Sequence, residues 1–504
     1  MEYNFSKLQN GSDIRGVALD LNPDEKVNLD TYAVERIAEG FLIHMMEKTG
    51  KAAEDLTIAL GRDSRLSGPD IEDTLATTLS SYGVKVLIAG LASTPAMFMS
   101  CIFPEFDCDG AIMITASHLP QNRNGMKFFD KNGGFEKSDI KSILNKAEEK
   151  QMLKQTEAKE TSIINLMARY AEHLRSLIIT GTGQAEEPLK GLKITVDAGN
   201  GAGGFYAEYV LAPLGADVSS SQFLLPDGTF PNHMPNPENK EAMASICNKV
   251  KEAGSDLGII FDTDVDRASA VDENGKEINR NGIVALAAAL IADHNPQGIV
   301  VTDSITSTQL NHFITDELGM NHLRFKRGYR NVIGRSIELC NEGKNSPLAI
   351  ETSGHAAYRD NYFLDDGAYL ATKIVVKTAL LKKEGKGISS LIAGLEEPAE
   401  AKEIRFPLSG DNFKQVGDMI IDDLKTITSE GKLKGATLEL PNYEGVRIKF
   451  DDQEVKGWML LRKSLHDPIM PLNMESDTEG GILVIADRIR PVLSQYRELN
   501  IAGL

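Results

Sequence analysis

Short apolar runs alternate with amphipathic stretches along most of the chain, and this alternation is the strongest constraint on its fold. The apolar runs lie at residues 84–88, 111–114, 192–196, 257–261 and 299–301. The segments between them have the 3.6-residue period of helices. Continuous apolar runs of this length are typical of strands that helices cover on both faces. The sequence therefore predicts an α/β protein with mainly parallel sheets.

The chain is long enough for three or four domains, since it has 504 residues. Residues 150–183 are expected to form a long helix followed by a polar connector. After a further boundary around residues 400–406 the pattern becomes strand-rich, and residues 443–450 and 457–461 resemble a hairpin. The breaks in the pattern predict three α/β domains and a smaller α+β domain, at residues 1–188, 189–296, 297–403 and 404–504.

Composition excludes several classes of protein. The formal net charge of −19 argues against a nucleic-acid partner, because such proteins collect a basic face. The polar amino terminus has no apolar signal core, and the longest apolar stretch, near residues 283–291, is far shorter than the ~18 residues of a membrane span. The four cysteines lack metal-ligand spacing, so we expect buried thiols and a cytoplasmic protein without a membrane partner.

A net-acidic protein still binds small anions where basic residues converge locally. Several arginines and lysines lie in turn-like, glycine-rich segments rather than in charge-mixed helices. These candidates are Arg15, Arg62, Arg65, Lys127, Arg267, Lys326, Arg330, Arg447 and Arg462.

Residues 115–120, Thr-Ala-Ser-His-Leu-Pro, follow the apolar run 111–114 directly. A turn at this point places the hydroxyl of Ser117 at the carboxyl end of a strand, where open α/β sheets bind ligands. His118 and Lys127 lie nearby in sequence and could move protons. The alternative is an ordinary polar loop in which Ser117 caps a helix.

Three aspartates, Asp262, Asp264 and Asp266, follow the apolar run 257–261. Alternate carboxylates at a strand end can converge on one point, which suits an oxygen-preferring cation such as Mg²⁺. Without a cation they would repel one another strongly. Arg267 could pair with one of them or reach a phosphate. The alternative is a solvated acidic turn.

Two further loops carry polar groups after apolar runs. Residues 351–355, Glu-Thr-Ser-Gly-His, offer donors and acceptors for sugar hydroxyls, although a histidine satisfied within a turn is the alternative. Residues 462–468, Arg-Lys-Ser-Leu-His-Asp-Pro, combine donors that would suit a phosphate, although a plain basic turn is the alternative.

In this order and at these intervals, the four loops resemble those of the α-D-phosphohexomutase family, and the resemblance covers essentially the whole chain. Further family-like motifs lie at residues 12–16, 61–68, 94–95, 197–203 and 326–329. Glycine-rich turns recur on unrelated folds, so the joint order carries the resemblance. The 351–355 loop is closer to the phosphoglucomutase/phosphomannomutase branch than to the branch acting on glucosamine phosphates.

The resemblance implies four domains with mixed sheets around one cleft, with a fourth domain that closes, and the interconversion of hexose 1- and 6-phosphates of glucose and/or mannose. Phospho-Ser117 would donate its phosphoryl group and give a 1,6-bisphosphate. Mg²⁺ and glucose 1,6-bisphosphate are the implied cofactors, and the protein would be a monomer or homodimer. The implied catalytic residues are Ser117, His118, Lys127, Arg15, Arg267 and His355; the metal ligands are Ser117, Asp262, Asp264 and Asp266; the substrate-binding residues are Lys326, Glu351, Ser353, His355, Arg447, Arg462, Lys463, Ser464 and His466.

Some positions depart from the family pattern. Thr263 and Val265 stand where the family has glycines, Leu119 stands where it usually has Asn, and residues 465–467 are Leu-His-Asp. The first two changes reduce backbone freedom but leave every carboxylate in place. The others bear on phosphate contacts and substrate choice.

Two other functions stay open at this point. Residues 261–265 also fit the pattern of haloacid-dehalogenase-type phosphatases, in which Asp262 would be the nucleophile and Asp365 and Asp366 the later acidic pair. The altered 462–468 loop is also compatible with a catalytically silent regulator that binds sugar phosphates.

Overall fold

The computed structural model describes residues 4–149, 157–410, 412–464 and 467–504. The chain forms two compact units. The first comprises Met1–Ile291 and Ser353–Ala393, and the second comprises Ala292–Thr352 and Gly394–Leu504. The division places 353–393 with the first unit, although the segment lies within the predicted third domain.

The amino-terminal sheet of the first unit has the strand order β1-β2-β6-β5-β3-β4-β8, with β7 beside β6. β3 pairs in parallel with β4 and β5, whereas β6 is antiparallel to β5 and β2, so the sheet is mixed. Its strands are β1 (Gln9–Asn10), β2 (Asp13–Val17), β3 (Thr57–Arg62), β4 (Lys85–Leu91), β5 (Gly110–Ile114), β6 (Arg123–Asp130), β7 (Gly133–Gly134) and β8 (Ser162–Ile163).

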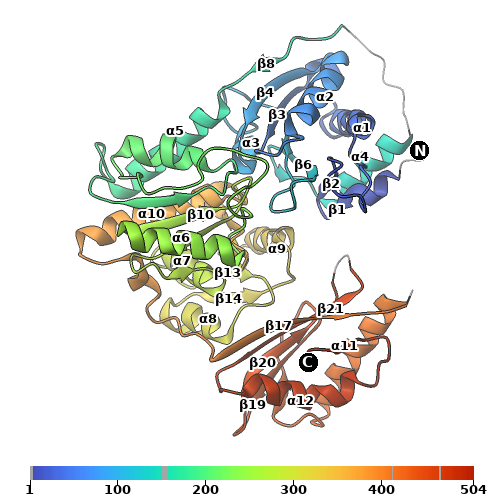
Figure 1. The fold of residues 1–504 in the computed structure, drawn as a ribbon, viewed down its shortest axis with the longest axis vertical. Coiled ribbons are helices and arrows are strands. Elements are labelled where there is room, and N and C mark those ends of the chain that lie inside the picture. The colour runs from blue at the N-terminus through green and yellow to red at the C-terminus, as the bar shows by residue number, and fades with distance from the viewer. Residues whose placement is uncertain (1–3, 150–156, 411, 465–466) are drawn as a thin grey trace. The chain divides into compact units, whose positions relative to one another are not determined.

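Helices cover both faces of this sheet (Figure 1). α1, α2 and α4 bury their apolar sides in one continuous core with β3, β5 and β6. α3 packs against β3, β5 and β6 from the other face. The helices are α1 (Thr31–Thr49), α2 (Gly68–Ser81), α3 (Thr94–Met99), α4 (Lys137–Glu149) and α5 (Leu166–Thr182).

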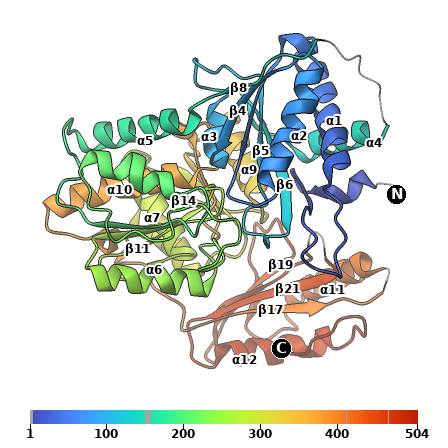
Figure 2. The ribbon, with the colours of Figure 1, turned by 45° about the horizontal axis from the view of Figure 1, so that its top comes forward.

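A second sheet in the first unit has the order β12-β11-β10-β9. β10 is parallel to β9 and antiparallel to β11. α10, which belongs to the 353–393 segment, packs against β10, β11 and α5 (Figure 2). The strands and helices of this part are β9 (Ile194–Asp197), β10 (Leu257–Phe261), β11 (Ala268–Val271), β12 (Glu277–Ile278), α6 (Lys240–Ala253), α7 (Asn281–Ala292) and α10 (Gly367–Lys383). β16 (Ala356–Tyr358) also lies in the first unit but is not a strand of this sheet.

The second unit contains a parallel arrangement and an antiparallel sheet. β13 lies between β14 and β15 and is parallel to both. The antiparallel sheet has the order β17-β21-β20-β19-β18, and α11 and α12 bury its apolar face. The elements are β13 (Ile299–Thr302), β14 (Asn321–Arg324), β15 (Leu348–Ile350), α8 (Thr308–His312), α9 (Tyr329–Asn341), β17 (Glu400–Pro407), β18 (Ala436–Leu438), β19 (Val446–Asp451), β20 (Lys456–Leu461), β21 (Ile469–Ser476), α11 (Phe413–Ser429) and α12 (Gly481–Leu493).

The predicted fold class is confirmed: the predicted apolar runs form β4, β5, β9, β10 and β13, and the predicted hairpin is β19–β20. The predicted long helix over 150–183 is wrong in its start, because α5 begins at Leu166, where the Asn165 side chain accepts from the backbone of Ala168. Residues 150–156 lie outside the described residues. Residues 400–406, the predicted boundary, form most of strand β17, whose inward-facing Ile404 and Phe406 join the core of the antiparallel sheet.

The expectation of buried cysteines is only partly met. Cys101 and Cys108 are buried as predicted, whereas Cys247 and Cys340 are only partly buried. Within the described residues, no helix combines the length and the apolar character that crossing a membrane requires.

Candidate functional site

The turn after β5 presents Ser117 in a strained and buried position. Ser117 has φ +48°, in the left-handed region, and is 8% exposed. Its backbone N–H donates to Thr115 Oγ1 at 2.8 Å, and its Oγ donates to Asp262 Oδ2 at 2.9 Å. Ser117 is therefore not a helix cap but a hydroxyl held at a strand end against the aspartate loop.

A buried arginine, Arg65, holds this turn through its backbone carbonyls. Arg65 donates to the carbonyl oxygens of Ser117, Leu119 and Pro120, at 2.6 Å for Leu119 and 2.8 Å for Pro120. Asp63 accepts from the backbone N–H of Arg65 at 2.9 Å and lies 3.3 Å from its guanidinium. Because both side chains are fully buried, this charge pair fixes the turn that carries Ser117.

The three aspartates lie in the loop between β10 and β11 and are buried. One oxygen of each lies within 4.8 Å of the others. Thr94 at the start of α3 donates to Asp264 Oδ2 at 2.5 Å, and its backbone N–H donates to the Asp264 carbonyl at 2.8 Å. The alternative of a solvated acidic turn is thus wrong, since Asp262 and Asp264 are 0% exposed and Asp266 1%.

Val265 explains why a glycine would suit this loop. Its φ is +67°, a conformation that β-branched residues adopt only under strain of about 1–3 kcal/mol. The Val265 carbonyl accepts from the backbone N–H of Gly367, and a Cβ on Gly367 would lie 2.6 Å from the backbone of Arg267. The loop is therefore held in place by the amino-terminal end of α10.

Lys127 on β6 points into the aspartate cluster. Its ammonium donates to Asp264 Oδ2 at 2.9 Å and also to Asp266 Oδ2. Burial lowers the pKa of Lys127, but the two carboxylates outweigh it and hold the pKa well above its usual value. Arg15 on β2 pairs with Asp13 at 2.8 Å and donates to the Thr115 carbonyl, so it braces the turn beside Ser117.

The aspartates have the properties of a cation site. Asp264 Oδ1 and Asp266 Oδ1 are buried and have no hydrogen-bond partner among the described residues. Burial and the carboxylates of Asp266 and Asp264 raise the pKa of Asp262 well above its usual value. A hard divalent cation would satisfy the free oxygens and relieve this repulsion, so the donor set fits Mg²⁺.

Arg267 connects the aspartate loop with the serine turn. Its Nε donates to Asp262 Oδ2 at 3.2 Å, and its Nη2 donates to Ser117 Oγ at 3.2 Å and to His118 Nδ1 at 2.7 Å. Burial and the charge of Arg267 lower the pKa of His118 to about 3. His118 therefore accepts from Arg267 and helps to orient it, and its predicted part in proton transfer stays a prediction.

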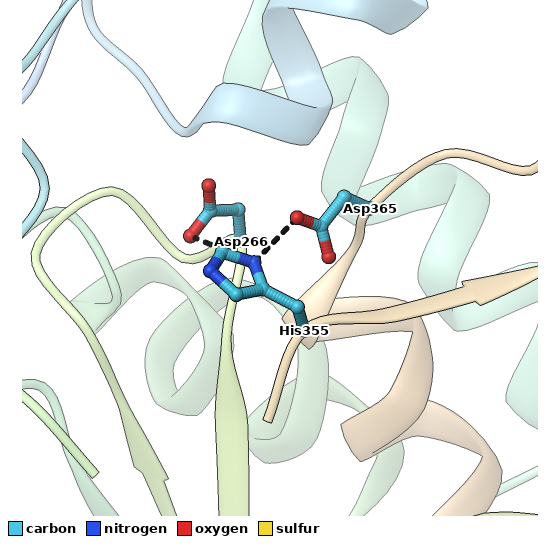
Figure 3. A group of neighbouring side chains, drawn as sticks. All are labelled: Asp266, His355 and Asp365. Atoms are coloured by element: carbon cyan, nitrogen blue, oxygen red, sulfur yellow. Dashed lines mark hydrogen bonds and ion pairs between the residues drawn. The ribbon is translucent and has the colours of Figure 1, made fainter. Parts of the chain in front are cut away.

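His355 lies between two carboxylates (Figure 3). Its Nδ1 is 2.5 Å from Asp365 Oδ2 and 4.0 Å from Asp266 Oδ1. Burial lowers the pKa of His355, but Asp365 and Asp266 raise it to about 9. The imidazole is therefore a positive charge beside the aspartate cluster. Its partner, Asp365, lies outside the 351–355 turn, so the alternative of a histidine that bonds only within its own turn does not hold.

Along the chain, the 351–355 loop contains residues of both units. Glu351 lies in the second unit, is buried, and accepts from the backbone N–H of Gly328 at 2.6 Å, within the 326–329 motif. Ser353 lies in the first unit and is also buried. Lys326 is exposed.

The two predicted phosphate-binding arginines differ in their surroundings. Arg447 donates to Glu439, to the Ser304 carbonyl at 2.9 Å and to the Thr306 carbonyl at 3.0 Å, and its guanidinium lies 3.6 Å from the Trp458 ring centre. These contacts use one N–H of each guanidinium nitrogen. Arg447 therefore joins β19 to the loop after β13, and its part in substrate binding stays a prediction.

Arg462 is 8% exposed, and its Nε has no hydrogen-bond partner among the described residues. Burial lowers the pKa of Arg462; the nearby Glu444 raises it, and the positive charge of Arg327 lowers it further. Lys463 pairs with Asp418 at 2.5 Å, and Ser464 Oγ accepts from the backbone of Asp467. His466, also predicted as a ligand, lies outside the described residues.

Several residues of the site were not among the predicted site residues. Asp63 and Thr94 lie inside the 61–68 and 94–95 motifs, Arg65 was predicted only as a candidate for anion binding, and Asp365 was not among the predicted ligands or catalytic residues. The opposite charges of Asp63 and Arg65, two positions apart in a glycine-rich motif, are the signal that could have identified Asp63 as a partner of Arg65.

Comparison with known proteins identifies the family. Three family models, described as phosphoglucomutase/phosphomannomutase alpha/beta/alpha domains I, II and III, match residues 6–154, 168–275 and 279–398. A phosphoglucomutase/phosphomannomutase of Thermococcus kodakarensis is 31% identical over 425 residues, 84% of this chain and 86% of that one. This chain belongs to the phosphoglucomutase/phosphomannomutase family.

Other relatives agree. A phosphoglucomutase of Neisseria gonorrhoeae is 29% identical over 454 residues, 89% of this chain and 91% of its own. A crystal structure of a phosphoglucomutase/phosphomannomutase family protein from Burkholderia thailandensis superimposes with a TM-score of 0.79 at 26% identity and covers 98% of both chains. As a member of the phosphoglucomutase/phosphomannomutase family the protein is an enzyme, which favours a hexose-phosphate mutase over the phosphatase and the silent regulator.

Proposed function

We propose that this enzyme interconverts the 1- and 6-phosphates of glucose and/or mannose through phospho-Ser117 and a hexose 1,6-bisphosphate. The observation that carries the proposal is the position of Ser117 Oγ. It lies 2.9 Å from a carboxylate oxygen of Asp262 and 3.2 Å from the Arg267 guanidinium, in a buried site. A hydroxyl between a cation-binding carboxylate and a fixed guanidinium suits a nucleophile in phosphoryl transfer.

The proposed reaction has two transfers. The bond between phosphorus and Ser117 Oγ breaks as a hydroxyl oxygen of the sugar phosphate forms its own bond to phosphorus, and the hydroxyl proton passes to an acceptor in the site. The bisphosphate then turns around. Its other phosphoryl group returns to Ser117 Oγ, and the sugar oxygen that it leaves takes up a proton.

The residues around Ser117 have distinct parts in this proposal. Arg267 stabilises negative charge on the transferring group, and Arg15 braces the turn from below. Lys127 and His355 are the proposed proton carriers, because both lie beside the aspartates. Asp262, Asp264 and Asp266 would hold Mg²⁺, with an oxygen of phosphorylated Ser117 as a further ligand. When bound, this ion supplies charge neutralisation at the phosphoryl group.

Substrate recognition is proposed for the 351–355 and 462–468 loops. Glu351, Ser353 and His355 would contact sugar hydroxyls, with Lys326 at the edge. Arg462 and Ser464, helped by Lys463 and His466, would hold the phosphate that does not react. The buried Nε of Arg462 supports this part, since it has no hydrogen-bond partner among the residues that the structure describes and an anion would supply one.

The proposal predicts both a product and a labelled residue. The purified enzyme with Mg²⁺ and a trace of glucose 1,6-bisphosphate should convert glucose 1-phosphate to glucose 6-phosphate in a coupled dehydrogenase assay. Intact mass and peptide mapping should find one stable phosphoryl group on Ser117. A label on Asp262 with release of phosphate would support the phosphatase instead. Sugar-phosphate binding without label or turnover would support the regulator.

Arg462→Ala should act mainly on substrate binding. Loss of a charge-assisted contact of ~1.5–3 kcal/mol would raise KM roughly 10- to 150-fold, with a smaller effect on kcat if the contact is equally strong in the ground and transition states. Steady-state kinetics with glucose 1-phosphate and mannose 1-phosphate measure this. Arg405→Ala is a suitable control, because Arg405 lies on β17 of the antiparallel sheet from which the 462–468 loop extends, and its side chain is 66% exposed. An unchanged KM in Arg462→Ala would place the phosphate elsewhere.

A further inference from the structure

Residues 223–239, called here the 223–239 loop, have no part in the reaction proposed above. A buried pair ties this loop to β9. His233 Nε2 donates to Asp197 Oδ2 at 3.0 Å, and His233 Nδ1 lies 3.1 Å from the Met234 carbonyl oxygen. Both ring nitrogens face acceptors, so the imidazole is held as a cation that donates twice. Burial lowers the pKa of His233, but Asp197 raises it above its usual value.

The 197–203 motif holds this loop and the aspartate loop together. Gly199 has φ +52°, and a Cβ there would lie only 2.7 Å from the Cβ of Pro235, so only glycine fits. Further along the motif, the backbone N–H of Ala202 donates to the Thr263 carbonyl at 2.8 Å. The motif thus contacts the 223–239 loop at one end and the aspartate loop at the other.

The 223–239 loop ends on Arg267. Asn236 Oδ1 accepts from Arg267 Nη1 at 3.3 Å, and Glu238 Oε2 lies 3.7 Å from the same nitrogen. The other nitrogens of this guanidinium contact Ser117 and Asp262, each at 3.2 Å. The loop therefore holds Nη1, the guanidinium nitrogen that does not contact Ser117 or Asp262, and so helps to fix the orientation of the whole group.

The same loop also contacts the support of the serine turn. A Cβ on Gly228 would lie 2.5 Å from the Ser64 carbonyl oxygen, so the two backbones are in direct contact. The ring centre of Phe230 lies 5.4 Å from the Arg65 guanidinium carbon. One loop thus touches two of the arginines that bind the Ser117 turn, Arg65 and Arg267.

We propose that Asn236 is a positioning residue for Arg267, and that the Asp197–His233 pair anchors the loop that presents it. The inference rests on the proposed function and deepens it. A planar guanidinium fixed on only one side can pivot about its bonds to Ser117 and Asp262. A displacement of about 1 Å at a reacting centre costs on the order of 10²-fold in rate.

Asn236→Ala should lower kcat for glucose 1-phosphate by about 10- to 100-fold and change KM by less than about threefold. Asn236→Asp keeps an acceptor oxygen at the same place and should recover most of kcat. In an Arg267→Lys background, which lacks the planar guanidinium, adding Asn236→Ala should cost little more, because the two residues act as a unit. Steady-state kinetics of these variants and the wild type provide the measurement.

Asn232→Ala is the matched control, since Asn232 lies in the same loop but donates to Asn200 Oδ1 at 2.7 Å instead of contacting Arg267. Its kcat should stay within about twofold of wild type. Thermal unfolding of each variant detects lost structure. If Asn236→Ala fails to fold, Glu238→Gln replaces it as the test, because Glu238 lies beside the same Arg267 nitrogen and its side chain is 34% exposed. Its kcat should fall below that of wild type, but by less than the roughly 10- to 100-fold expected for Asn236→Ala.

A kcat of Asn236→Ala equal to that of wild type would overturn the inference. So would the same fractional loss of kcat in the Arg267→Lys background, or an equal loss in Asn236→Asp or Asn232→Ala. A wild-type enzyme without mutase turnover would contradict the proposed function instead, and for this reason the wild-type assay comes first.

Discussion

Ser117→Ala is expected to lose mutase turnover by on the order of 10³-fold or more, because it removes the oxygen that is proposed to carry the phosphoryl group. The fold should persist, since Arg65 binds the backbone carbonyls of the turn rather than the Ser117 hydroxyl. The incorporation of phosphoryl from glucose 1,6-bisphosphate, followed by intact mass, should vanish together with turnover. The coupled assay and the mass measurement use the same protein samples.

Ser138→Ala serves as its control, because Ser138 is exposed on α4. Its turnover and its phosphoryl incorporation should match those of wild type. Activity of Ser117→Ala within a few-fold of wild type would rule out Ser117 as the nucleophile. A label that persists in Ser117→Ala and moves to Asp262 would support the phosphatase chemistry.

Asp264→Asn is expected to have the next largest effect. Loss of partners that only orient a metal ligand typically costs 10- to 100-fold in affinity or activity, so loss of a ligand itself should cost at least about 100-fold in turnover. Mg²⁺ affinity, measured by isothermal titration calorimetry, should fall as well. Excess Mg²⁺ should restore part of the rate, because Asp262 and Asp266 would still bind the ion.

Asp293→Asn makes the same chemical change at an exposed position beyond α7 and should leave Mg²⁺ affinity unchanged. Wild-type metal dependence in Asp264→Asn would show that the aspartates do not bind the ion. Lys127, which already donates to Asp264 and Asp266, and the nearby His355 would then neutralise the cluster.

Much of the site was predictable because strand ends in an α/β sheet gather polar side chains at one edge. The apolar runs before Ser117 and before Asp262 place both residues at such ends, and the structure brings them within 2.9 Å. Lys127 was predictable for a related reason, because the strand that returns beside β5 carries it back to the same edge. The mixture of parallel and antiparallel pairing in the sheets of β5 and β10 was harder to predict, because a buried strand has the same apolar run in either direction.

The sequence by itself determined the α/β class, the positions of the main strands and the residue types of the serine and aspartate loops, because these follow from local patterns of polarity and backbone freedom. Only the tertiary structure decided which charged side chains are already paired. Arg447 and Arg462 follow similar patterns in sequence, yet Arg447 donates to Glu439 and two carbonyls, whereas the Nε of Arg462 has no hydrogen-bond partner in the described part of the chain. The partners of a buried charge come from segments distant in sequence, as Asn236 does for Arg267, and no local pattern encodes that meeting.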